Sequence, residues 1–350
     1  MKGNLLALIL SIIFTVFLGE ILCRSFSKNP YINENTFIQL IRIRQPNMDY
    51  TVDRRAIAPK DPHVSVKTDE RAYYLPSRRF SKPDSTIVFL GGSTTECAAV
   101  REELRFPVVV SYELEKSGYK VNSLNIAMSG NTTHDSLNIL LNHVVLDRPD
   151  IAILMEGIND IGVLAQDGGY QSRMMQPLRF QTLLDWTKQR LSSSSWLFAR
   201  LRYFGAWHKK MGLTPRTENF EKRKQRNIFP EDDFRMRLKA FIALSRAFSI
   251  QPVLMTQPFS KFLNEFTPAW RDIRAQKRAN EIVRELGEKE DVLVIDLMSY
   301  LSSLADYSEP LKIFFDGVHV TDYGSTLEGE YITKVLIESR ILKEINSKKQ

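Results

Sequence analysis

The sequence predicts an α/β fold of three layers, in which helices cover both faces of a parallel sheet of about five strands. From residue 86 onward, short apolar runs alternate with longer segments whose apolar residues recur at helical spacing. Strands that are separated by helices pair in parallel, because the helix returns the chain to the same end of the sheet. The 350 residues are 43% hydrophobic and 25% charged, so the chain can bury the core of one or two domains.

The predicted strands are apolar runs that end at glycine or at polar residues. They cover residues 86–90, 121–127, 151–155, 252–256 and 292–297. The first ends at Gly91 and Gly92, and the third ends at Glu156 and Gly157, which are turn signals. The intervening segments predict helices at 106–116, 134–146, 234–248, 275–286 and 321–341. Gly287 is expected to end the fourth of these helices.

The N-terminus carries an uncharged apolar run over residues 5–19, which continues past Glu20. About 19 helical residues just span the hydrocarbon core of a bilayer. A signal peptide would also need a small-residue cleavage site, and no Ala-x-Ala pattern follows the run. We therefore expect an uncleaved signal anchor at 1–28, which is a single transmembrane helix, and a membrane-proximal segment at 29–85. Positive charges flank both ends of the helix, so they do not set its orientation.

The net charge of +7 is concentrated in one segment. Residues 186–226 hold eleven Lys and Arg against two Glu, so the rest of the chain is close to neutral. This distribution argues against a body that binds nucleic acid. The segment belongs to a basic helical insert at about 165–230, for which three interpretations stay open. It is a solvated helical hairpin, a lid over the pocket near Ser93, or an amphipathic surface that rests on an anionic membrane.

Residues with catalytic side chains follow the predicted strands. Ser93 lies in a glycine-rich turn after the first strand, and Asp316 precedes His319 by three residues in the loop before the last helix. In such sheets ligands bind beyond the carboxyl ends of the strands, so we expect these side chains to converge. A hydroxyl nucleophile, an imidazole base and a carboxylate that orients the imidazole are the groups that serine-based acyl transfer requires.

Four blocks of the sequence, in this order, resemble the SGNH or GDSL hydrolase family. They are Gly91-Gly92-Ser93-Thr94-Thr95, Met128-Ser129-Gly130-Asn131, Gly157-Ile158-Asn159-Asp160 and Asp316-Gly317-Val318-His319. The resemblance covers roughly residues 86–345 and implies a flavodoxin-like α/β/α domain, the SGNH hydrolase fold. The first block departs from the family's common Gly-Asp-Ser, because Gly92 stands in the middle position. That Asp is not the triad carboxylate, so we expect little effect on the mechanism.

The resemblance also implies a role for each residue. Ser93 would be the nucleophile, His319 its general base and Asp316 the partner of the imidazole. The backbone N–H groups of Ser93 and Gly130 and the side-chain amide of Asn159 would form the oxyanion hole. Each donor aimed at an oxyanion is worth roughly 3 kcal/mol of transition-state stabilisation.

Structural roles compete with these assignments. Ser93 could cap a helix, although Thr94 and Thr95 compete for that role. Asp160 is expected to cap the helix after the third strand and to order its loop. Asp322 also lies three residues from His319, and we interpret it as a cap of the last helix together with Thr321 rather than as the imidazole's partner.

The sequence therefore predicts a serine esterase that hydrolyses a short acyl ester, such as acetyl, on a carbohydrate or lipid through an acyl-enzyme. No CxxC pair, HExxH or GxGxxG motif is present, so we expect neither a metal nor another cofactor. Two alternatives stay open: an O-acyltransferase of envelope polysaccharide, and an inactive carbohydrate-binding or assembly factor on the same scaffold. The expected location is the membrane, with the soluble domain on the extracytoplasmic side.

Overall fold

The structure is a computed structural model that describes most of the chain. The described residues are 2–26, 41–165, 169–170, 187, 190–192, 194–202, 229–262 and 273–349. They fall into two compact units. One comprises Met1–Leu40 and Gln171–Lys224, and the other comprises Ile41–Tyr170 and Gln225–Gln350.

The second unit is built on a parallel sheet of five strands. These are β3 (Ser85–Gly91), β4 (Val121–Asn125), β5 (Ile151–Met155), β6 (Gln251–Met255) and β7 (Leu293–Ile295). Their spatial order is β4-β3-β5-β6-β7, and every neighbouring pair is parallel. This is the flavodoxin-like order, in which β3 lies at the point where the winding direction reverses. The predicted fold class is thus confirmed, and the switch point falls at the strand that precedes Ser93.

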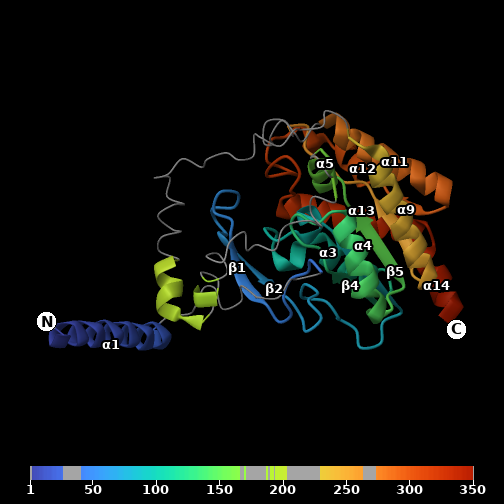
Figure 1. Ribbon diagram of the computed structural model, residues 1–350. Helices are drawn as coiled ribbons and strands as arrows, with labels where there is room; N and C mark the ends of the chain where they lie inside the picture. The colour runs from blue at the N-terminus through green and yellow to red at the C-terminus, as the bar shows by residue number, and fades with distance from the viewer. Residues whose placement is uncertain are drawn as a thin grey trace. The chain divides into compact units, whose positions relative to one another are not determined.

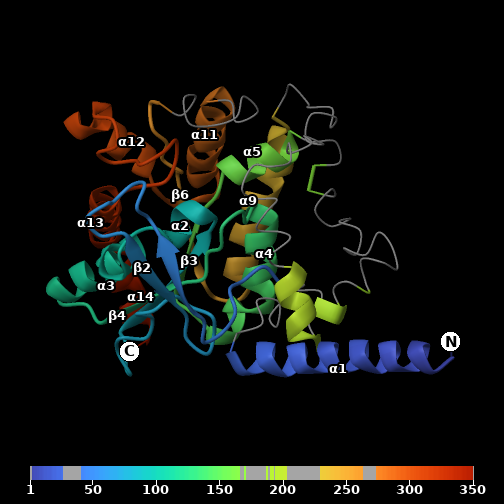
Figure 2. The ribbon, with the colours of Figure 1, turned by 90° about the vertical axis from the view of Figure 1, so that its left-hand side faces the viewer.

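Helices cover both faces of this sheet, as Figure 2 shows. One face carries α4 (Thr133–Asn142), α5 (Ile158–Leu164), α9 (Glu231–Ala247) and α11 (Ile273–Glu290). The other carries α3 (Phe106–Lys116), α12 (Leu297–Ser303), α13 (Asp322–Glu338) and α14 (Ile341–Lys349). Figure 1 labels these helices along the chain.

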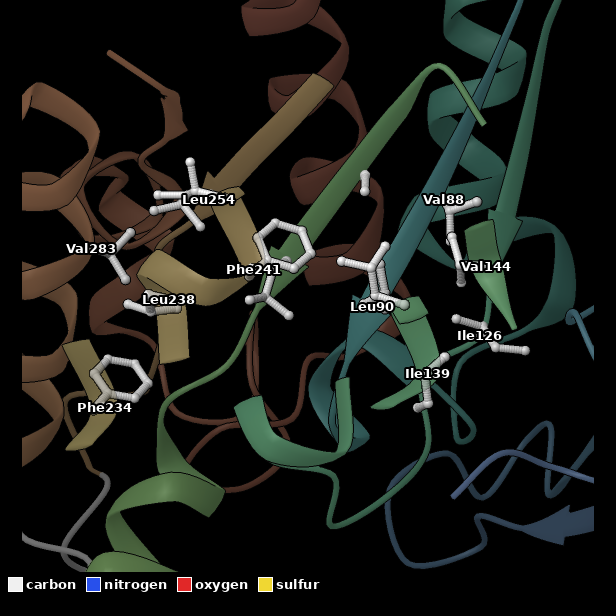
Figure 3. Packing of buried hydrophobic residues seen from close by; sticks show 14 of the residues in the cluster. Val88, Leu90, Ile126, Ile139, Val144, Phe234, Leu238, Phe241, Leu254 and Val283 are labelled. Carbon is white, nitrogen blue, oxygen red and sulfur yellow. The ribbon is translucent and has the colours of Figure 1, made fainter. Parts of the chain in front are cut away.

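Strand β3 contributes to both hydrophobic layers because its successive side chains point to opposite faces. Val88 and Leu90 belong to the cluster under α4 and α9, part of which is shown in Figure 3. Ile87 and Phe89 belong to the cluster under α3 and α13. All four side chains are buried, which fixes the strand and the turn that follows it.

Two predicted helices end differently in the structure. The helix expected at 134–146 stops at Asn142, and a 3₁₀ turn follows at Val144–Asp147. The helix expected to end at Gly287 continues to Glu290. A Cβ at residue 287 would lie 2.1 Å from Cγ2 of Val294, so this glycine allows α11 to approach β7 and does not end the helix.

The C-terminal predictions need two further corrections. The expected strand at 292–297 is shorter, because Asp296 accepts a hydrogen bond from the Ser299 N–H and so begins α12. The expected helix at 321–341 divides into α13 and α14 at Arg340, which adopts a left-handed conformation with φ of 61°. Thr321 caps α13, as predicted, by accepting from the Gly324 N–H at 3.1 Å.

Residues 41–85 hold a β-hairpin that the sequence analysis missed. Strand β1 (Asp49–Asp53) pairs antiparallel with β2 (His63–Lys67), and Val52 lies opposite Val64. Figure 2 shows this hairpin in front of the parallel sheet. The hairpin belongs to the same compact unit as the sheet, so this part of the predicted membrane-proximal segment is integral to the folded body.

The first unit contains α1 (Lys2–Phe26). Its stretch Ala7–Phe26 is long and apolar enough to cross a membrane, although a signal sequence would meet the same criterion. Glu20 of α1 accepts hydrogen bonds from the N–H groups of Trp196 and Leu197 at 2.9 and 3.0 Å, at the start of a short helix over 196–202. Most of the predicted basic segment 186–226, and residues 29–40, lie outside the described residues.

Candidate active site

Three of the sequence-predicted residues form one hydrogen-bonded chain. Ser93 is the first residue of α2 (Ser93–Glu96), directly after β3, and its Oγ lies 2.7 Å from Nε2 of His319. Nδ1 of His319 lies 2.7 Å from Oδ2 of Asp316. A carboxylate at Nδ1 keeps the proton on that nitrogen, so Nε2 is free to accept a proton from the serine hydroxyl. The arrangement can therefore activate Ser93 as a nucleophile.

The loop that carries the imidazole is held by its own carboxylate. Oδ1 of Asp316 accepts the backbone N–H groups of Val318 and His319 at 2.8 and 2.7 Å, while Oδ2 faces the imidazole. Burial alone would raise the pKa of Asp316, but hydrogen bonds from His319 and Val318 outweigh it and lower that pKa. Asp316 is thus ionised at neutral pH. The Phe315 ring stacks against the imidazole with centroids 5.6 Å apart, which restricts its rotation.

The expected oxyanion donors lie in the loop after β4 and in the first turn of α5. Gly130 follows β4 and has φ of +79°, a backbone conformation that favours glycine. Asn159, in the first turn of α5, donates from Nδ2 to the carbonyl oxygen of Asn131 at 2.8 Å. An amide nitrogen carries two N–H groups, so the second can serve an oxyanion.

Gly92 explains how the Asn159 amide reaches the serine turn. A Cβ at residue 92 would lie 2.5 Å from Nδ2 of Asn159 and 3.3 Å from the carbonyl oxygen of Asn131. Real side chains do not approach so closely, so glycine at this position leaves the space that the amide occupies. Gly92 is the position at which this chain departs from Gly-Asp-Ser. Here the blocks that contain Ser93, Asn131 and Asn159 pack closely against one another.

Gln257 is a site residue that the sequence analysis missed. It follows β6 and donates from Nε2 to Oγ1 of Thr94 at 2.9 Å, while its Oε1 accepts the Ile158 N–H at 2.7 Å. One buried side chain thus links the helix that begins at Ser93 to the turn that carries Asn159. Its only signal in the sequence is a polar position after an apolar strand.

Asp160 does not have the capping role that we expected. Gly157 occupies the N-terminal cap of α5, and the buried Asp160 accepts from the backbone N–H and hydroxyl of Thr133 and from the Tyr170 hydroxyl. Burial raises the pKa of Asp160 to about 6, against the lowering effect of these hydrogen bonds. The side chain ties α5 to the start of α4 and so supports the loop after β4.

A half-open cavity of about 280 Å3 lies beside the serine. Ser93, Asp316 and His319 line it, together with a set of small or apolar side chains. These are Val52, Cys97, Ala98, Ala99, Val100, Phe315 and Val320, and the hydroxyl residues Thr94 and Ser129 complete the lining. Val52 comes from β1, so the hairpin supplies part of the wall. The cavity is suited to an apolar group that is attached to the atom attacked by Ser93.

Comparison with known proteins agrees with this architecture. The model of the GDSL-like lipase/acylhydrolase family matches residues 89–327, more than half of the chain. The chain therefore belongs to the GDSL-like lipase/acylhydrolase family, which confirms the resemblance carried by its four sequence blocks. As a member of this family it is an enzyme that hydrolyses ester bonds.

Solved structures similar to this chain include two enzymes with low sequence identity. A lipase/acylhydrolase from Enterococcus faecalis is 20% identical, with 73% of this chain and 96% of that chain covered and a TM-score of 0.47. A catalytic mutant of an acetylxylan esterase from Geobacillus stearothermophilus is 15% identical, with 73% and 93% covered and a TM-score of 0.43. No curated protein matches the chain.

Proposed function

We propose that this protein is a serine esterase that cleaves an acyl ester through a covalent acyl-enzyme on Ser93. The single observation that carries the proposal is the chain from Asp316 through His319 to Ser93, with both contacts at 2.7 Å. Ser93 Oγ attacks the ester carbonyl carbon while its proton passes to Nε2 of His319. The imidazolium then gives this proton to the departing alcohol, which leaves the acyl group on Ser93.

Water completes the cycle by the same route in reverse. His319 takes a proton from water, the resulting hydroxide attacks the acyl carbonyl, and the proton returns to Ser93 as the acid leaves. Both steps pass through a tetrahedral oxyanion. The N–H groups of Ser93 and Gly130 and the Asn159 amide are our proposed donors to it, each worth roughly 3 kcal/mol.

The cavity supports a short acyl group as the part of the substrate that enters beside Ser93. An apolar engineered cavity of about 150 Å3 holds one benzene molecule, so the volume of about 280 Å3 suits chains up to roughly eight carbons. Part of its wall is aliphatic, formed by Val52, Ala98, Ala99, Val100 and Val320, and burial of each methylene group contributes about 0.8 kcal/mol. We propose that a carbohydrate or lipid alcohol forms the exposed part of the ester.

The test combines covalent labelling with hydrolysis of an ester series. Ser93 of the full chain in detergent should react with a fluorophosphonate, and esters with two to eight acyl carbons should be hydrolysed faster than esters with ten or twelve. Ser93→Ala should abolish both signals, whereas Ser117→Ala, at the exposed end of α3, should retain them. A folded protein that neither labels nor hydrolyses would instead indicate an inactive scaffold. An acyl-enzyme that discharges only when a sugar acceptor is added would indicate a transferase.

We also propose that α1 anchors the enzyme in the membrane, with the second unit on the extracytoplasmic side. The apolar stretch Ala7–Phe26 supports the anchoring. Alkaline extraction should leave the protein in the membrane fraction, and N-terminal sequencing should begin at residue 1. A soluble product that begins after residue 23 would show that the helix is a cleaved signal sequence.

A further inference from the structure

A fully buried carboxylate lies three residues after Ser93. Glu96 ends α2 and has 0% exposure. Its Oε1 accepts the Tyr74 hydroxyl at 2.5 Å and Nε of Arg44 at 2.8 Å, and Arg44 Nη2 also contacts it. Its Oε2 accepts the backbone N–H of Ser129 at 2.7 Å and the Ser129 hydroxyl. Burial of an unpaired carboxylate is costly, and this one is satisfied by donors from three separate segments.

Ser129 directly precedes Gly130, so Glu96 holds one side of the glycine that we propose as an oxyanion donor. Arg44 makes this possible by compensating the buried charge. Burial alone would lower the pKa of Arg44, but the adjacent carboxylate of Glu96 outweighs it and raises that pKa.

The other side of Gly130 is held by the same N-terminal segment. Arg42 donates from Nε to Oδ1 of Asn131 at 3.2 Å and from Nη2 to the carbonyl oxygen of Ser129 at 3.0 Å. In return, Nδ2 of Asn131 donates to the carbonyl oxygen of Arg42 at 3.2 Å. Arg42 thus contacts both neighbours of Gly130, and Arg44 reaches one of them, Ser129, through Glu96. The family match begins only at residue 89, so these two arginines lie outside it.

We propose that Arg44 and Arg42 are positioning residues that set the direction of the Gly130 N–H toward the oxyanion. This inference rests on the proposed esterase function. Oxyanion donors act only when they lie within about 2.7–3.1 Å of the oxygen, and their supporting contacts must hold them within roughly 0.5 Å. A glycine between two unrestrained neighbours would not meet this condition. The segment before the hairpin is therefore part of the catalytic apparatus.

The two arginines should contribute to stabilisation of the transition state and not to substrate binding. The substrate oxygen carries its full negative charge only after the nucleophile has attacked. A misplaced oxyanion donor therefore lowers kcat with little change in KM. Arg44→Met keeps the length of the side chain and removes the donors to Glu96. We expect it to lower kcat roughly ten- to hundredfold, below the loss for complete removal of one donor, which is about 10²–10³. Arg44→Lys, which restores a charge, should recover part of the loss.

The experiment measures kcat and KM of the full chain in detergent, well below the melting temperature of each variant. Arg278→Met is the matched control, because this arginine of α11 pairs with Glu231 of α9 and with Glu285 of its own helix. It should lower the melting temperature while kcat stays within twofold of wild type. Arg42→Met, at a half-exposed position, should lower kcat in the same direction as Arg44→Met but by less, and it serves if Arg44→Met does not fold.

A double-mutant cycle separates positioning from stability. If Arg44 acts through Glu96 on the Gly130 loop, Arg44→Met should cost much less kcat in a Glu96→Gln background than in wild type. Equal losses of kcat in both backgrounds, or lower stability with unchanged kcat, would overturn the positioning role. Either result would leave the esterase function in place. Absence of Ser93-dependent hydrolysis in the wild-type chain would overturn the esterase function and this inference with it.

Discussion

Arg54 of the hairpin region donates from Nη1 to Oδ1 of Asp322 at 2.8 Å. Arg101 donates to the same carboxylate from its backbone N–H at 3.0 Å and from Nε at 2.9 Å. Asp322 follows His319 by three residues, just as Asp316 precedes it by three. Two arginines thus engage Asp322, whereas Asp316 contacts the imidazole, with Oδ2 2.7 Å from Nδ1. Asp322 is therefore not the helix cap that we expected. It fastens the start of α13 to Arg54 and Arg101.

This geometry predicts different losses for the two aspartates. Asp316→Asn should reduce kcat by about 10³–10⁴, because an amide no longer holds the imidazole in the required tautomer. Asp322→Asn should leave kcat within about tenfold and should lower the free energy of unfolding by about 2–3 kcal/mol, since Arg54 has a nearly buried side chain. Steady-state kinetics and urea denaturation measure the two effects. The reverse ranking in kcat would assign the base partner to Asp322.

Gly92→Ala tests the close approach of the Asn159 amide. The new methyl group would lie 2.5 Å from Nδ2, so the amide or the serine turn must shift. We expect kcat to fall by roughly 10–100-fold, toward the loss for one oxyanion donor. In an Asn159→Ala background the same substitution should cost little, because the clashing amide is gone. A similar loss in both backgrounds would show that Gly92 acts on the turn itself.

Val52 should limit the length of the acyl chain. Val52→Phe places a larger ring in the cavity wall, so kcat/KM for esters of six to eight acyl carbons should fall by about tenfold while acetyl esters are spared. Thr51→Phe is the matched control, because adjacent residues of a strand point to opposite faces and Thr51 is exposed. Equal losses for all chain lengths in Val52→Phe would argue against an acyl group at this wall.

Asp296 should make stability dependent on acid pH. Burial alone would raise its pKa, but hydrogen bonds from Arg284, Ser299 and Thr256 lower it to about 2. The unfolded chain has a pKa near 3.9 at this position, so the native state gains stability above about pH 4 and loses it as pH falls toward 2. For this half-exposed side chain we expect a contribution of about 1–2 kcal/mol at pH 7.

Urea denaturation of wild type and Asp296→Asn at two pH values measures this contribution. The difference in the free energy of unfolding should be largest at pH 7 and should shrink by pH 3. A difference that is the same at both pH values would mean that the cap and the packing of Asp296, and not its charge, stabilise α12.

The sequence was most informative where local pattern alone decides structure. Strand β5 at 151–155 and helix α3 at 106–116 begin and end at the predicted residues. Both are continuous apolar or amphipathic runs with clear end signals. Ser93, Asp316 and His319 could be placed because their residue types are rare in combination and each follows a recognisable boundary. Parallel topology then implies that such positions meet at one edge.

The contacts that the sequence did not predict join side chains that lie far apart in the chain. Glu96 resembles an ordinary acidic residue at the end of a short helix, and nothing near it indicates that Arg44 lies against it. Gln257 likewise gives no sign that it joins two loops. The strands β1 and β2 have five residues each, and each turns only two side chains inward, Tyr50 and Val52 in β1 and Val64 and Val66 in β2. This alternation is too short to predict a hairpin.

The pairing of Glu96 with Arg44 also limits how far the N-terminus can be truncated for expression. A recombinant product that starts at residue 86 would keep the whole family match but would lose Arg44 and Tyr74. Its internal carboxylate would then face only the Ser129 donors. Such a product should be poorly soluble. Starting at residue 41 removes the apolar N-terminal helix and keeps both partners, and is the better choice for crystallisation.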